Sequence, residues 1–149
     1  MTSGVIERRA PCPLRVLVAE DNDIVRETIA CFLTTMGIGV QGAVDGHEAL
    51  RFWLADPAAS DVLITDHKMP GMNGVELVRE IRRHPPAGTE LKVVVYSGCL
   101  EGADVASYVA LQVARLIQKP CLPRDLIAAV LAPNMPAVDE AHASSRNRG

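Results

Sequence analysis

Short apolar runs alternate along the chain with segments in which apolar residues recur every three or four positions. Short runs rich in β-branched residues are typical of buried strands, and the longer spacing is typical of helices with one buried face. The sequence predicts strands over residues 14–20, 38–44, 62–65, 91–96 and 116–118. It predicts helices over residues 23–36, 46–55, 75–83, 102–113 and 123–132.

This alternation of strands and helices predicts a parallel sheet with helices on both faces. The strands are apolar without an inward–outward alternation, as expected for parallel strands that are buried on both sides. Right-handed crossovers leave few arrangements. We therefore expect a doubly wound, flavodoxin-like α/β fold with five helices and the strand order 2-1-3-4-5. One domain over residues 14–132 would lie between a flexible leader (1–13) and a disordered tail (133–149).

Composition excludes several classes of protein. The chain has 149 residues, of which 48% are apolar, so one domain with a buried core is expected. A net charge of −3 with only 3% aromatic residues argues against nucleic-acid binding. No apolar stretch suits a secretion signal or a membrane span. The four cysteines form no C-x-x-C pair, which argues against zinc and fits a reducing cytoplasm.

Reactive side chains stand at the ends of the predicted strands. The first strand ends in Glu20 and Asp21, while Asp66 ends the third strand, Ser97 the fourth and Lys119 the fifth. The carboxyl ends of parallel strands lie on one edge of a sheet, so these groups should converge. Clustered carboxylates suit Mg²⁺, which keeps waters and leaves room for a phosphate. A carboxylate can itself attack phosphorus, and the central Asp66 is the candidate for that role.

Each of these residues has an ordinary structural explanation when it is taken alone. Acids at a helix start favour the helix dipole, and Asp66 and Ser97 could simply form turns. A lysine is usually a solvated charge. Those explanations would all have to hold together at four strand ends, which favours the functional interpretation.

Four neighbouring side chains receive no chemical role. Strand alternation should point His67 away from Asp66. Cys99 follows Ser97 and would line the mouth of the site. Trp53 and Tyr108 are interpreted as packing residues.

The strand-end motifs resemble the receiver domain of two-component response regulators. The matching segments are Val-Leu-Val-Ala-Glu-Asp-Asn (16–22), Leu-Ile-Thr-Asp-His-Lys-Met-Pro-Gly-Met-Asn-Gly (63–74), Val-Val-Val-Tyr-Ser-Gly (93–98) and Ile-Gln-Lys-Pro (117–120). They stand in the family's order and cover about residues 14–132. The end of the pattern near residue 132 suggests a stand-alone or excised receiver.

The resemblance implies a role for each site residue. Asp66 would accept a phosphoryl group from a histidine kinase or a histidine phosphotransfer protein. Glu20, Asp21, Asp66 and the backbone carbonyl of Lys68 would hold Mg²⁺. Lys119 and Ser97 would contact the phosphoryl oxygens. The chain would be a signalling domain rather than an enzyme, with only self-catalysed phosphotransfer and autodephosphorylation.

Two positions depart from the family pattern. The family often has Tyr or Phe three residues before its lysine, where this chain has Leu116, which places the usual aromatic coupling in question. Lys68 adds a cation near the acceptor, and we hypothesise that it alters the lifetime of the phosphoryl group. By analogy, residues 102–113, 116–118 and 123–132 would form the surface read by a downstream protein, and a homodimer is left open.

Two other functions remain as alternatives. Leu116 supports a receiver-fold binding module that works without phosphorylation. The segment Asp21-Asn22-Asp23-Ile24-Val25 also fits the D-x-D-x-[TV] pattern of haloacid-dehalogenase-like phosphatases. However, Glu20 separates that segment from its strand, and past Lys119 only Asp125 appears before the tail, where those enzymes need an acidic pair.

Overall fold

The computed structural model describes residues 14–134, so the predicted leader and all but the first two residues of the predicted tail lie outside the described residues. Five strands form one sheet: β1 Arg15–Ala19, β2 Gly39–Ala43, β3 Val62–Asp66, β4 Lys92–Ser97 and β5 Arg115–Gln118. Every pairing is parallel, and the order is β2-β1-β3-β4-β5. The predicted doubly wound fold and strand order are confirmed.

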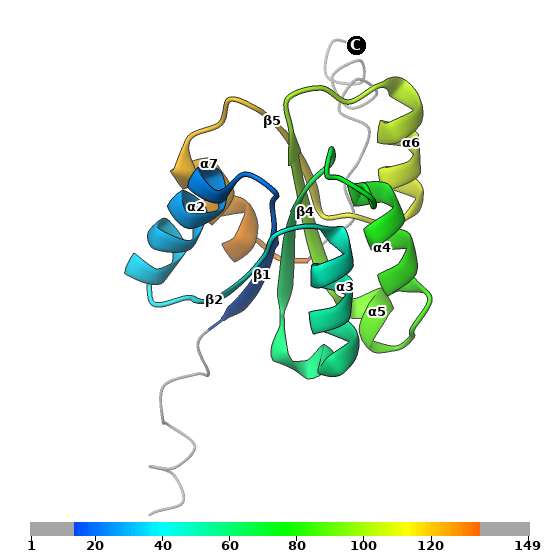
Figure 1. Ribbon diagram of the computed structural model, residues 1–149, viewed down its shortest axis with the longest axis horizontal. Coiled ribbons are helices and arrows are strands. Elements are labelled where there is room, and N and C mark those ends of the chain that lie inside the picture. Colours follow the sequence, from blue (N-terminus) through cyan, green and yellow to red (C-terminus); the bar gives the residue numbers. More distant parts are fainter. Residues whose placement is uncertain (1–13, 135–149) are drawn as a thin grey trace, which may run out of the picture.

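Helices cover both faces of the sheet (Figure 1). They are α2 Asp23–Thr35, α3 Gly46–Ala55, α4 Gly74–Arg82, α5 Ala87–Glu90, α6 Gly102–Ala110 and α7 Pro123–Leu131. Figure 1 shows α2 and α7 on one side of the sheet and α3, α4 and α6 on the other. Among residues 14–134, no helix is both long and apolar enough to span a membrane.

The helix prediction missed two short elements and one helix end. The structure adds α5, of four residues, and a 3₁₀-helix at Pro57–Ala59. Neither is long enough to show a hydrophobic period, and both lie beside prolines that indicate turns. The helix predicted over residues 102–113 ends at Ala110, because Gln112 takes a left-handed conformation with φ of 60°.

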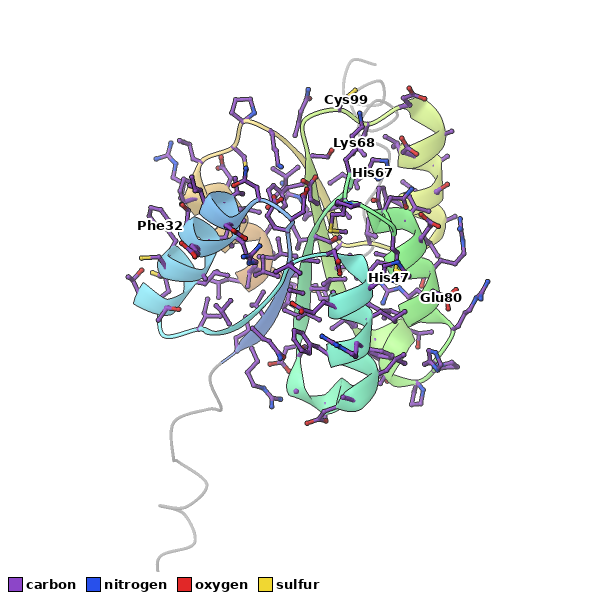
Figure 2. All side chains as sticks on the ribbon, viewed as in Figure 1. Phe32, His47, His67, Lys68, Glu80 and Cys99 are labelled. Carbon is purple, nitrogen blue, oxygen red and sulfur yellow. The ribbon has the colours of Figure 1, made fainter. Side chains whose placement is uncertain are left out.

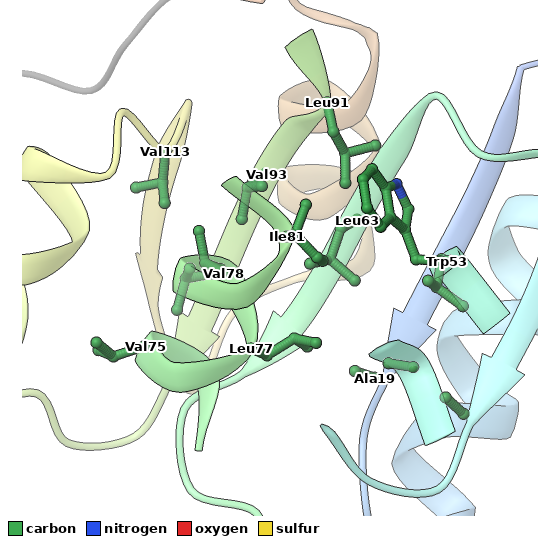
Figure 3. Close-up of a cluster of buried hydrophobic side chains, with 14 of the residues drawn as sticks. Ala19, Trp53, Leu63, Val75, Leu77, Val78, Ile81, Leu91, Val93 and Val113 are labelled. Atoms are coloured by element: carbon green, nitrogen blue, oxygen red, sulfur yellow. The ribbon is translucent and has the colours of Figure 1, made fainter. Parts of the chain in front are cut away.

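Side chains that alternate along the central strands pack into two separate hydrophobic cores, one on each face of the sheet. Leu17, Leu63 and Val93 face α3, α4 and α6, where Trp53 and Ile81 complete a fully buried cluster (Figure 3). The strand residues between them face α2 and α7. Their cluster contains the strand residues Val16, Val18, Ile64, Val94 and Tyr96, together with Leu33 of α2 and Leu126 of α7. The strands are therefore buried on both faces, which explains why their sequences show no alternation.

Helix caps fix the loops that follow the strands. The Asn22 side chain accepts a hydrogen bond from the Val25 amide and begins α2 directly after the first strand end. Asn73 and Glu76 form a reciprocal capping box at the start of α4. These caps hold the loops after β1 and β3 on the same edge of the sheet, where the predicted site lies.

Candidate functional site

Three carboxylates meet where β1 and β3 end. Oxygens of Glu20, Asp21 and Asp66 all lie within 4.8 Å of one another. The pairing of Ala19 with Thr65 brings the two strand ends into register. Glu20 is 1% exposed and Asp66 is 8% exposed, whereas Asp21 faces solvent. The predicted convergence of these acids is present in the structure.

Lys119 places a cation against this cluster. Its Nζ lies 3.1 Å from Oδ2 of Asp66 and 3.4 Å from Oε1 of Glu20. A 2.9 Å hydrogen bond from the Lys119 amide to the Ser97 carbonyl ties the ends of β5 and β4 together. The Ser97 side chain is buried, and its Oγ lies 3.4 Å from the Cys99 amide nitrogen. One ammonium thus faces three carboxylates, so the cluster keeps an excess of negative charge that can attract a further cation.

Tyr96 is a member of the site that the sequence interpretation missed. Its hydroxyl donates a 2.5 Å hydrogen bond to Oε1 of Glu20. Its ring also lies under the Lys119 ammonium, with Nζ 4.5 Å from the ring centroid. A tyrosine in an apolar strand looks like a packing residue, but its pairing with Asp66 across β3 and β4 places it within reach of the acids.

The electrostatics of the site follow from burial and from these contacts. Burial alone would raise the pKa of Glu20, but hydrogen bonds from the Asn22 amide and the Tyr96 hydroxyl give a net lowering. Burial and the neighbouring Glu20 carboxylate raise the pKa of Asp21. Burial opposes the charge of Lys119, yet its contact with Asp66 leaves the pKa of the ammonium raised. Glu20 and Lys119 are therefore held in their charged forms.

His67 holds the other oxygen of Asp66. Its amide donates a 2.6 Å hydrogen bond to Oδ1 of Asp66, while Lys119 contacts Oδ2. The His67 ring is buried and packs against α6, with Nδ1 2.7 Å from the Tyr108 hydroxyl and Nε2 3.4 Å from Oδ2 of Asp104. The ring thus engages α6 rather than Glu20, Asp21 or Asp66, and Tyr108 has a polar contact besides its packing.

Lys68 and Cys99 lie at the exposed rim of the site. Both side chains are exposed, and Figure 2 shows them beyond the strand ends, near His67. Two exposed side chains therefore border the cluster where the strands end.

The set of donors fits a hard divalent cation. Three carboxylates supply oxygen ligands only, and two of them are already fixed by hydrogen bonds from Tyr96 and His67. Mg²⁺ prefers a few carboxylate oxygens and retains waters that a phosphate can replace. Together with the Lys119 ammonium, the arrangement can bind and polarise a phosphoryl group.

Comparison with known proteins shows which sequences this chain resembles. The family model of the response regulator receiver domain matches residues 16–131. Regulator of RpoS from Escherichia coli K12 is 30% identical over 125 residues, which are 81% of this chain and 36% of that protein. Response regulator GacA from Pseudomonas aeruginosa is 39% identical over 90 residues, which are 59% of this chain and 40% of that protein. The chain thus spans less than half the length of these two relatives.

Two solved structures share the fold along nearly their whole length. A response regulator receiver protein from Pseudomonas putida is 30% identical, with a TM-score of 0.73 over 81% of this chain and 98% of that one. The chemotaxis protein CheY4 of Vibrio cholerae is 25% identical, with a TM-score of 0.73 over 80% of this chain and 97% of that one. This chain therefore belongs to the response regulator receiver domain family.

Proposed function

We propose that the chain is a phospho-acceptor signalling domain in which Asp66 takes a phosphoryl group from a phosphohistidine donor. The observation that carries the proposal is the position of the Asp66 carboxylate, 3.1 Å from Lys119 and within 4.8 Å of two further acids. An isolated turn aspartate would need neither the buried Glu20 nor the cation. The site lies within the segment 14–132 that we assign to the receiver domain.

Each residue has a role in the proposed transfer. A carboxylate oxygen of Asp66 attacks phosphorus, the P–N bond to the donor imidazole breaks, and the bonding electrons leave with the ring nitrogen. Glu20, Asp21, Asp66 and the Lys68 carbonyl would hold Mg²⁺, which would neutralise charge on the phosphoryl oxygens. Lys119 binds one of these oxygens, and the Ser97 hydroxyl donates to another. The protein thus positions the phosphoryl group and balances the negative charge on its oxygens.

An apolar groove beside the site is the proposed contact surface for the donor. It has a volume of about 460 Å³ and runs between α2 and α7, and Tyr96 and Lys119 of the site form part of its lining. Ile24, at the start of α2, is 76% exposed beside it. A histidine kinase or a histidine phosphotransfer protein that covers this groove would bring its phosphohistidine to Asp66.

The output surface is proposed to be α6, β5 and α7, through which the phosphorylated domain would signal to a protein partner. These elements border the site through Lys119 and through the His67 contact with α6. We place these encounters in the cytoplasm, and Cys31, Cys99 and Cys121 are free thiols in the described part of the chain.

The proposal is tested with Mg²⁺ and acetyl phosphate, followed by intact mass spectrometry. We expect one phosphoryl adduct in the wild type, none after chelation of Mg²⁺, and none in Asp66→Asn. The matched control is Asp61→Asn, just before the opposite end of the same strand, which should keep the adduct. No wild-type adduct with any donor would favour the phosphorylation-independent binding module. Sustained turnover of a small phosphate ester would favour the phosphatase.

A further inference from the structure

His67 connects the acceptor to α6 through consecutive short contacts. Its amide donates to Oδ1 of Asp66 at 2.6 Å, and its Nδ1 lies 2.7 Å from the hydroxyl of Tyr108, 41 residues along the chain. The second ring nitrogen lies 3.4 Å from Asp104, one turn earlier on the same helix. A ring with its proton on Nε2 can donate to Asp104 and accept from Tyr108.

This connection is tightly packed. Tyr108 is fully buried and His67 is 6% exposed. The Gly74 amide donates a 2.8 Å hydrogen bond to the His67 carbonyl. A Cβ atom at Gly74 would come within 2.3 Å of the Tyr108 hydroxyl and 2.7 Å of the Asp66 carbonyl. His67 is thus held at its amide, carbonyl and ring, so a displacement at Asp66 has little room to be absorbed locally.

Leu116 offers no comparable contact. It is partly buried against the apolar cluster beneath α3, α4 and α6, and its side chain has no polar atom. Lys119 links Asp66 to the end of β5, whereas the hydrogen-bonded path from Asp66 to α6 runs through His67 and Tyr108.

We propose that His67 is a positioning residue that couples phosphoryl transfer at Asp66 to α6 through Tyr108 and Asp104. This inference rests on the proposed function. Once either oxygen of Asp66 bonds to phosphorus, Oδ1 becomes part of an acyl phosphate, a mixed anhydride, and no longer carries carboxylate charge. Charge-assisted hydrogen bonds are about twice as strong as neutral ones, so the bond from the His67 amide weakens. The His67 ring then shifts against Tyr108, and the packing of α6 changes with it.

The test compares hydrogen–deuterium exchange of residues 102–111 with and without Mg²⁺ and beryllofluoride, a non-covalent phosphoryl mimic. In the wild type we expect the mimic to change exchange in α6 by about fivefold or more, the lower end of ordinary coupling between sites. Tyr108→Phe keeps the buried ring and removes the hydroxyl. It should bind the mimic, as measured by fluorine NMR, but lose most of the α6 response. Asp104→Asn changes the second contact of the His67 ring and should also reduce the exchange response of α6.

The matched control is Ser107→Ala, which removes a half-buried residue's hydroxyl that donates to the Ala103 carbonyl of the same helix. It should keep the wild-type response. A full α6 response in Tyr108→Phe, or no α6 response in a wild type that binds the mimic, would overturn the coupling and leave the proposed function intact. A wild type that neither binds the mimic nor forms the phosphoryl adduct would instead overturn the proposed function, and the coupling with it.

Discussion

The hydroxyl of Tyr96 and the Oε1 atom of Glu20 lie 2.5 Å apart, and Lys119 Nζ approaches the same Oε1 at 3.4 Å. Glu20 is almost fully buried, so these donors replace the water that its charge has lost. Burial raises the pKa of Tyr96, and the neighbouring Glu20 carboxylate raises it further. The tyrosine therefore remains a hydrogen-bond donor, and Glu20 remains an oriented carboxylate.

Tyr96→Phe should weaken Mg²⁺ binding by about tenfold, because partners that orient a metal ligand contribute about 10–100-fold to affinity. The measurement is isothermal titration calorimetry with Mg²⁺. Ser107→Ala is the control, since it removes a hydroxyl that bonds to the Ala103 carbonyl of α6 and should leave Mg²⁺ affinity unchanged. Equal affinities in wild type and Tyr96→Phe would contradict a role for the Tyr96 hydroxyl in holding Glu20.

Most of the site residues that the sequence predicts stand at the ends of strands. Hydrophobic runs fix where parallel strands stop, and the residue after each stop must lie on the common edge. Glu20, Asp66 and Lys119 were placed in this way, and their contacts agree with it. The reasoning needs only strand positions and the handedness of the crossovers.

Contacts that depend on side-chain direction were beyond that reasoning. Tyr96 reaches Glu20 across β3, which requires the register between three strands. His67 meets Tyr108 only because α6 is rotated to present that residue to the sheet. Nothing in the local pattern of either residue marks a polar partner that is distant in sequence.

Gly74→Ala should destabilise the domain by about 1–3 kcal/mol, the usual cost of overpacking a core. The added methyl group would meet the Tyr108 hydroxyl and the Asp66 carbonyl, both of which are fixed by their own packing. Urea denaturation measures the change. Gly102→Ala is the control, because it is also the first residue of a helix and its Cβ would meet nothing within 4 Å. It should leave stability unchanged or raise it by up to about 1 kcal/mol.

Arg82→Lys should lower the free energy of unfolding by about 1–3 kcal/mol, because an ammonium cannot reproduce the planar fork of the guanidinium. Arg82 lies at the end of α4 and donates hydrogen bonds to four backbone carbonyls, those of Gly88, Leu91, Leu111 and Gln112. It thereby joins α4 to α5 and to the end of α6. Urea denaturation measures the change. Arg79→Lys, at an exposed position on the same helix, should leave the free energy of unfolding unchanged. A similar loss of stability in both variants would argue against the role of Arg82 in binding the four carbonyls.

Lys92→Met should destabilise the domain by about 1–3 kcal/mol, because one buried and one partly buried carbonyl would lose a charged donor. Lys92 begins β4, is 5% exposed, and donates through Nζ to the carbonyls of Val130 and Ala132 at the end of α7. A cation there also suits the helix dipole. Thermal and urea denaturation should give the same loss. Lys68→Met, at an exposed position, should change stability little. An equal loss of stability in both variants would contradict the role of Lys92 in capping the end of α7.

Lys68→Ala should shorten the lifetime of the phosphoryl group on Asp66 by about two- to fivefold, which corresponds to an exposed charge interaction of up to about 1 kcal/mol. Lys68 is exposed at the rim, two residues after the acceptor. Its ammonium can contact the acyl phosphate and hinder approach of water. The measurement is the decay of the phosphoryl adduct by intact mass after acetyl phosphate is removed. Lys68→Arg keeps the charge and should decay at nearly the wild-type rate, and the gap between the two variants should narrow at high salt, where exposed charges are screened. Decay of Lys68→Ala at the wild-type rate would exclude a role for this side chain and leave only its backbone carbonyl in the proposed metal site.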